Sequence, residues 1–164
     1  MMHRKRAVFL ILTLLFLAAA AVLAWNMLLV SRNIDPSTLT DNDRVAIYIE
    51  KVRFSAEVAV SPQKKAQGLS GHVQLMPKNG MFFVFENPDR HIFWMKDMLL
   101  GLDFIWMRNG TVVNVAKNIP PPEPDQEPET LTPDSAVDAV LEIPAGSVEQ
   151  FSISVGDRVY IKRL

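Results

Sequence analysis

An apolar run near the N-terminus constrains this chain more than any other feature. Residues 7–30 contain only two polar interruptions, Thr13 and Asn26. A helix of that length extends roughly 36 Å, enough to cross the hydrocarbon core of a bilayer. Because the preceding residues 3–6 are basic, we expect them to stay in the cytoplasm and the remainder of the chain to lie outside. Such a chain divides into a membrane segment and a separate folded part.

Two interpretations of the apolar run remain open. It could be a signal peptide cleaved after the small residue Ala24. It could instead be an uncleaved anchor, because apolar residues continue through residues 27–30. Its length favours the anchor. We therefore predict a single-pass cell-membrane protein with an extracytoplasmic C-terminal domain, or alternatively a secreted or periplasmic protein after cleavage.

Composition excludes several classes of chemistry. The chain has no cysteine, which rules out disulfides, cysteine-ligated zinc, iron–sulfur clusters and thiol catalysis. The net charge is −1, and we see no clustered basic face of the kind that nucleic-acid binding needs. We therefore predict no nucleic-acid partner.

Beyond the apolar run, the sequence predicts a linker and one globular domain. Residues 31–43 are polar, contain Pro36 and read as a linker, so the domain is expected over residues 44–164. Apolar residues recur with strand periodicity in short segments separated by turn residues. The segments are 45–49, 52–60, 81–85, 91–95, 99–107, 111–115, 137–143 and 158–162.

Turns and short helices complete this pattern. Asn87-Pro88-Asp89 and Asn109-Gly110 are turn sequences. Ser61-Pro62 predicts the start of a helix that ends at Gly68, and residues 144–150 predict one or two helical turns. The expected fold is mainly β (α+β), a compact antiparallel barrel or sandwich of about seven strands with one or two short helices. Its Pro- and Glu-rich residues 120–128 are expected to form a solvated loop.

Six segments in order resemble the domain of unknown function 192 family, over about residues 54–159. They are Gln67-Gly68-Leu69-Ser70-Gly71, Gly80-Met81-Phe82-Phe83-Val84-Phe85, Phe93-Trp94-Met95-Lys96-Asp97-Met98, Leu102-Asp103-Phe104-Ile105-Trp106, Val140-Leu141-Glu142-Ile143-Pro144-Ala145-Gly146 and Val155-Gly156-Asp157. The resemblance implies a small β-rich domain, often exported behind a hydrophobic segment in bacteria and archaea. It implies no established activity.

The chain departs from the family pattern at His72, where members usually have arginine, and at Gly101, where they usually have proline. If that arginine pairs with a carboxylate such as Asp103 or Glu142, His72 would make a weaker, pH-dependent pair. His72 is therefore a candidate site residue.

The run from Phe93 to Asp103 places Trp94, Lys96, Asp97 and Asp103 within otherwise apolar sequence. In a structural interpretation, the lysine pairs with a carboxylate, since a buried charge must be paired. In a functional interpretation, the aromatic and charged residues form one wall of a ligand site. We favour the structural interpretation but keep both.

Trp106 and Glu142 are further candidates. An exposed tryptophan beside carboxylates would suit stacking on a sugar ring, although a buried Trp106 is the simpler expectation. His72 and His91 are too few for a histidine-based metal site, so we predict no metal, no cofactor and no assigned catalytic residue.

The sequence therefore favours a binding module for a small polar ligand, a polysaccharide or an envelope protein, more readily than an enzyme. A hydrolase acting on envelope polymers through paired carboxylates, from Asp97, Asp103 and Glu142, is one alternative. A structural scaffold without a small-molecule site is another.

Overall fold

The computed structural model describes residues 15–22 and 33–164. The chain divides into two units, Met1–Asn33 and Ile34–Leu164, which are described separately. In the first unit, residues 15–22 are helical. Within the described residues, no helix combines the length and apolarity that crossing a membrane requires. Most of the expected membrane segment, residues 7–30, lies outside the described residues.

One seven-stranded sheet forms the second unit, with strand order β6-β5-β8-β3-β2-β1-β9. The strands are β1 (Arg44–Ile49), β2 (Val52–Ala59), β3 (Asn79–Asp89), β5 (Leu102–Arg108), β6 (Thr111–Ile119), β8 (Val137–Pro144) and β9 (Val159–Arg163). All neighbours are antiparallel except β2 and β3, which are parallel. A parallel pair needs a crossover connection, and residues 60–78 supply it.

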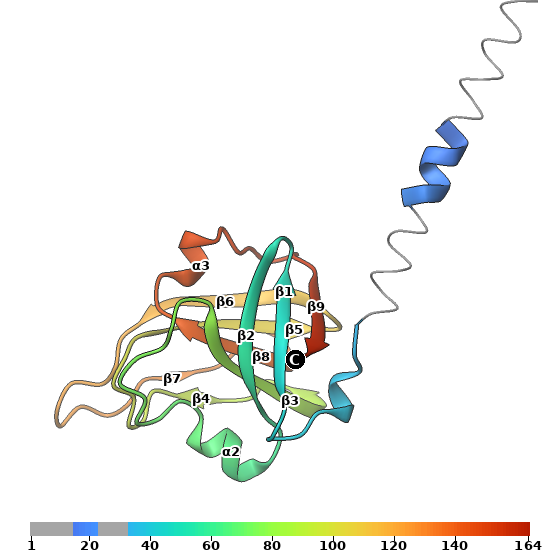
Figure 1. Ribbon diagram of the computed structural model, residues 1–164. Coiled ribbons are helices and arrows are strands. Elements are labelled where there is room, and N and C mark those ends of the chain that lie inside the picture. Colours follow the sequence, from blue (N-terminus) through green and yellow to red (C-terminus); the bar gives the residue numbers. More distant parts are fainter. Residues whose placement is uncertain (1–14, 23–32) are drawn as a thin grey trace, which may run out of the picture. The chain divides into compact units, whose positions relative to one another are not determined.

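The sheet curls until its two edge strands meet at one end (Figure 1). Thr111 at the start of β6 forms a bridge with Arg158, beside β9. The amide of Val112 donates to the Asp157 carbonyl, and the amide of Val159 donates to the Gly110 carbonyl, both over 2.9 Å. The expected mainly β fold with short helices is therefore confirmed, and its form is a single curled half-barrel sheet.

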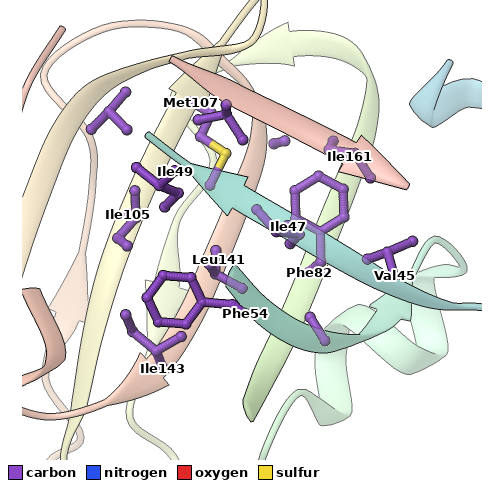
Figure 2. Close-up of a cluster of buried hydrophobic side chains, with 14 of the residues drawn as sticks. Val45, Ile47, Ile49, Phe54, Phe82, Ile105, Met107, Leu141, Ile143 and Ile161 are labelled. Atoms are coloured by element: carbon purple, nitrogen blue, oxygen red, sulfur yellow. The ribbon is translucent and has the colours of Figure 1, made fainter. Parts of the chain in front are cut away.

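The concave side of the sheet holds the larger core. Alternate residues of each strand point inward because successive side chains of a strand face opposite sides. Figure 2 shows these side chains packed against one another. The labelled ones come from β1, β2, β3, β5, β8 and β9: Val45, Ile47, Ile49, Phe54, Phe82, Ile105, Met107, Leu141, Ile143 and Ile161. These side chains form one continuous hydrophobic core.

A second cluster lies on the opposite face of β3, β5 and β8. Met81, Phe83, Phe104, Trp106 and Val140 point to this side from the sheet. They are covered by β4 (Phe93–Trp94) and β7 (Thr130–Leu131), which form a small antiparallel sheet of their own. Buried residues of the covering segments complete this cluster: Leu69, Phe93, Met95 and Met98. The central strands are thus buried on both faces, which explains their nearly continuous apolar sequence.

Two short helices flank the sheet. Helix α2 (Pro62–Gln67) begins as predicted, because the Ser61 hydroxyl accepts a hydrogen bond from the Lys64 amide over 3.1 Å. It ends as predicted at Gly68, whose φ is +52°. Helix α3 (Ser147–Gln150) is a single turn.

The described part of the expected linker contacts the domain. A 3-10 turn, η1 (Pro36–Thr38), precedes Leu39, which is 4% exposed and packs in the interior core. The Asp41 carboxylate accepts hydrogen bonds from the amides of Val60 and Ser61. The Ser61 side chain, together with these amides, holds the pKa of Asp41 below its usual value. Asp43 pairs with Arg163 over 2.9 Å.

Several predicted boundaries were wrong. Asn87-Pro88-Asp89 is the exposed end of β3 and not a turn, since a proline is tolerated where a strand has an unpaired edge. The strand expected over residues 91–95 is only two residues long. The one expected from residue 99 begins at Leu102. Strand β7 was not predicted, because two residues carry no periodic signal.

Candidate functional site

A pocket of about 340 Å³ opens between α2, β3 and β4. That volume lies at the small end of the usual range for ligand sites. The lining comprises residues 65–70, Phe83 and Phe85 of β3, residues 91–94, Met98, and Glu142 of β8. Apolar and aromatic side chains dominate it, and a few polar groups converge among them.

Aromatic rings form the wall along β3 and β4. Phe93 meets Phe83 edge to face with ring centroids 5.2 Å apart, and it meets Phe85 at 6.2 Å. His91 stacks on Phe85 at 3.6 Å, and the Lys65 ammonium lies 4.3 Å from the centre of the same ring. Burial lowers the pKa of Lys65, while the carboxylates of Glu86 and Asp41 oppose that shift. The wall therefore already holds a cation against an aromatic face.

Glu142 is the one acidic side chain that lines the pocket. It is 5% exposed, and its Oε2 atom has no hydrogen-bond partner among the described residues. Burial raises the pKa of Glu142 to about 8, so the carboxyl is largely protonated at neutral pH. A buried polar atom normally has a partner, and leaving one without costs about 1–3 kcal/mol. The Trp106 Nε1 and Arg108 Nη1 atoms are likewise buried without a partner among the described residues, but of the three side chains only Glu142 lines the pocket.

Two glycines lie beside Glu142, at positions where the neighbouring atoms leave little room for a side chain. At Gly80, a Cβ atom would lie 2.0 Å from the Glu142 carbonyl oxygen, so β3 and β8 can approach only if this residue has no side chain. At Gly68, a Cβ atom would lie 3.6 Å from Phe83 and 3.9 Å from the Glu142 Oε2 atom. In the sequence, Gly68 was predicted as the end of a helix, and Gly80 was named only as part of a family segment.

The run from Phe93 to Asp103 chiefly covers the second hydrophobic cluster, on the outer face of β3, β5 and β8. Phe93, Met95 and Met98 point inward and are buried, whereas Lys96 and Asp97 are exposed. The Lys96 carbonyl accepts a hydrogen bond from the Ser70 hydroxyl over 2.9 Å. The Asp97 carbonyl accepts one from the Gly71 amide over 3.0 Å. This segment is therefore fixed to the loop after α2, and together they frame the pocket.

Trp94 is the predicted residue of this run that reaches the pocket. It is 50% exposed and lines the rim. The Lys96 ammonium lies 5.6 Å from its ring centre, so the two side chains lie on the same side of the segment, as side chains two residues apart in an extended chain do. Lys96 and Asp97 themselves are not among the lining residues.

Asp103 has a structural role instead. It is fully buried, and its carboxylate accepts hydrogen bonds from the amides of Asn118, Gly146 and Val148 at 2.7, 3.2 and 2.7 Å. The last of these amides belongs to α3, which has no capping side chain of its own. Asp103 thus supplies, from β5, the acceptor that this helix start lacks.

Trp106 and His72 lie outside the pocket lining as well. Trp106 is 2% exposed, in agreement with the expectation of a buried tryptophan, and it stacks on Phe104 with ring centroids 5.8 Å apart. A ring nitrogen of His72 is hydrogen bonded to the Leu69 carbonyl over 3.0 Å, within its own turn. The pair with Asp103 or Glu142 that we considered does not form.

The candidate carboxylates do not converge. Asp103 faces the interior side of β5, whereas Glu142 faces the opposite side of the sheet, and Asp97 lies in an exposed turn. The pair required by a glycoside hydrolase is therefore not formed by these residues. Over residues 15–22 and 33–164, no three potential ligands of the His, Asp or Glu type are grouped closely enough to hold a metal ion.

Sequence reasoning missed most of the lining. Lys65 reads as a solvated helix residue, and Phe83, Phe85, Phe93 and Met98 read as core. Burial alternation could have placed Phe83 and Phe85 on one face of β3, but nothing in the sequence indicates that this face is left partly open.

Comparisons with known proteins agree with this architecture. The model of the DUF192 family, described as uncharacterized ACR, matches residues 45–161. A crystal structure from Sinorhizobium meliloti 1021, of a protein described as a candidate transcription regulator, is similar with 30% identity and a TM-score of 0.63. It covers 71% of this chain and 91% of that one. A protein of unknown function from Novosphingobium aromaticivorans DSM 12444 is similar with 31% identity and a TM-score of 0.60, over 71% of this chain and 82% of that one. No curated protein matches.

Proposed function

This chain belongs to the DUF192 family, for which no activity is established. From its pocket, we propose that the protein is a binding module for a small ligand. The ligand has a compact apolar body and one polar head. The body occupies the aromatic pocket, and the head bonds to Glu142. The observation that carries this proposal is that Glu142 lines the pocket although it is buried, with an Oε2 atom that has no hydrogen-bond partner among the described residues.

A structural role alone accounts poorly for Glu142. An apolar side chain at this position would pack against Phe83 without the cost of burying a carboxyl group. The carboxyl is therefore better explained by a partner that arrives from the pocket. Since the lining is apolar with a single buried acid, it favours one small molecule over an extended polysaccharide, which would need many hydrogen-bonding groups.

Binding of benzamidine, benzamide and benzoate to the full-length chain tests the proposal, because each carries one ring and one polar head. We expect at least one to bind with a dissociation constant of about 1 mM or tighter, as ligands of so few atoms do. In NMR spectra, the indole N–H signal of Trp94 at the rim should shift, while that of buried Trp106 should not.

Variants of α2 provide the matched control. Ala66 lines the pocket, so Ala66→Trp should fill it and abolish binding. Gln63 is exposed on the same helix but does not line the pocket, so Gln63→Trp should bind as wild type does. If no probe binds wild type, or if Ala66→Trp binds equally well, the pocket is not a ligand site.

We also propose that residues 7–30 anchor the protein in the cell membrane with its domain on the outer side. The support is the length of the apolar run and the basic residues 3–6 before it. Cell fractionation with protease treatment of intact cells tests this. A mature chain that begins near Trp25 and is found in the soluble fraction would replace the anchor with a cleaved signal peptide.

A further inference from the structure

We propose that the ligand's inner head is cationic, an amidinium or primary ammonium group that forms an ion pair with Glu142 inside the aromatic pocket. This inference rests on the proposed binding function and names its ligand class. Three features of the pocket support it: the unpartnered acid, the aromatic wall and the arrangement of charges at the mouth.

The unpartnered acid is the first feature. Glu142 offers hydrogen-bond acceptors at a position that is 5% exposed, and Oε2 receives no donor from the described residues. Ionising the group without a partner is costly, which is why burial raises the pKa of Glu142 to about 8. A cation that enters the pocket removes that cost, because it supplies both an opposite charge and N–H donors.

The aromatic wall is the second feature. Phe83, Phe93 and Trp94 line the pocket together with Phe85. Aromatic faces attract cations, and the attraction increases when the site excludes water. The protein already shows this chemistry on the same wall, where the Lys65 ammonium lies 4.3 Å from the centre of the Phe85 ring.

The arrangement of charge is the third feature. The other titratable side chains that line the pocket are Lys65, from α2, and His91, from the segment before β4. β3 and the residue 98 segment contribute only the uncharged Phe83, Phe85 and Met98. The pocket lining therefore has one acid, Glu142, and one lysine, Lys65. A ligand with one positive head fits this polarity, whereas a second positive charge beside Lys65 would be repelled.

Binding of such a cation must release a proton. At pH 7 Glu142 is mostly protonated, and the ion pair requires the carboxylate, so the proton passes to solvent as the cation binds. Most of one proton should be released per ligand at pH 7, and much less at pH 9. Affinity should accordingly rise about tenfold between these two pH values.

Isothermal titration of the full-length chain with benzamidine, benzamide and benzoate distinguishes the possibilities, because the three probes share a shape and differ in charge. We expect benzamidine to bind at least tenfold more tightly than benzamide at pH 9. Repeating the titration at pH 7 in two buffers of different ionisation enthalpy measures the released proton. Glu142→Gln should abolish both the preference and the proton release, and Lys65→Gln should tighten benzamidine severalfold.

Other outcomes overturn the inference in distinguishable ways. Equal or tighter binding of benzamide, lost in Glu142→Gln, would show a neutral head and leave the proposed function intact. Tighter binding of benzoate would show that protonated Glu142 donates to an anion. Benzamidine binding without proton release, or unchanged in Glu142→Gln, would place the cation elsewhere. If none of the probes binds, the proposed function fails together with this inference.

Discussion

Asp103 and Glu142 are buried acids on adjacent strands, and their surroundings differ completely. Asp103 lies on the interior side of β5 and accepts hydrogen bonds from three backbone amides. Glu142 lies on the other side of the sheet, opposite Phe104 in the register of β5 and β8, and its Oε2 atom has no partner in the described part of the chain. The burial of Asp103 is explained by the fold, because backbone amides donate hydrogen bonds to its carboxylate. A buried acid without a partner, facing a pocket, is explained better by something that binds.

The same contrast extends to the two faces of the sheet. The interior cluster is filled by side chains from all around the curled sheet (Figure 2). The outer cluster is covered by a two-stranded sheet, a loop and α2, and part of that cover is left open as the pocket. We therefore expect the interior to determine stability and the outer face to determine binding.

The largest expected difference is between Phe82 and Phe83, which are neighbours on β3 and face opposite sides. Phe82→Ala should lower the free energy of unfolding by about 3–5 kcal/mol, because it leaves a cavity in a closed core. Phe83→Ala should cost about 2 kcal/mol, since its cavity merges with an existing pocket, and it should weaken ligand binding. Urea unfolding of both variants measures the difference. If Phe83→Ala lowered the free energy of unfolding more than Phe82→Ala did, the outer face and not the interior would determine stability.

The next effect in size is the pH dependence of stability. The pKa of Glu142 is raised to about 8 in the folded protein, so between pH 4.5 and 8 the native state binds more protons than the unfolded state. Stability must therefore fall as pH rises through this range and level off above it. We expect Glu142 to contribute a loss of about 3 kcal/mol between pH 5 and 8.

Glu142→Gln isolates this contribution, because the amide has a similar shape and does not titrate. Unfolding curves of wild type and variant, measured at both pH values, should diverge as pH rises, with the variant losing less stability. Parallel pH profiles would mean that Glu142 is ionised or solvated in the folded protein, and its contrast with Asp103 would disappear.

A smaller effect is expected at Asp103. Asp103→Asn keeps the shape of the side chain but replaces an acceptor oxygen with a donor that faces backbone amides, at a cost of about 2 kcal/mol. Hydrogen exchange at the Val148 amide should accelerate, because that amide donates to Asp103. Asp138 is a suitable control, since it is partly exposed and accepts one backbone bond, from Asn109 over 2.9 Å. Asp138→Asn should change stability by less than about 0.5 kcal/mol, and equal losses in the two variants would argue against a special role for Asp103.

The difference between these two acids could not have been predicted from the sequence. Leu102-Asp103-Phe104 and Leu141-Glu142-Ile143 have the same pattern, an acid between two apolar residues. Strand periodicity predicts that each acid faces away from its neighbours, but which face of the sheet that is depends on the register between distant strands. Only the pairing of β5 with β8 reveals that the two acids point to opposite sides.

Local signals predicted the fold well where they were strong. The strands at residues 45–49 and 52–60, helix α2 with its Ser61 cap and the Asn109-Gly110 hairpin depend on nearby residues, and all were recovered. The covering sheet was not, because β4 and β7 are held by contacts such as the bond from the Met95 amide to the Glu129 carbonyl, 34 residues apart in sequence. The pocket lies under that cover, so its lining was hidden for the same reason.

The pairing of β1 with β9 has a consequence for how this protein is made. The first strand of the domain has its outer neighbour at the C-terminus, with Val45 opposite Arg163. During synthesis, β1 therefore has an exposed edge until β9 has left the ribosome. Sheets closed by such distant partners fold slowly, and unpaired edges invite aggregation. Loss of β9 would make that transient exposure permanent.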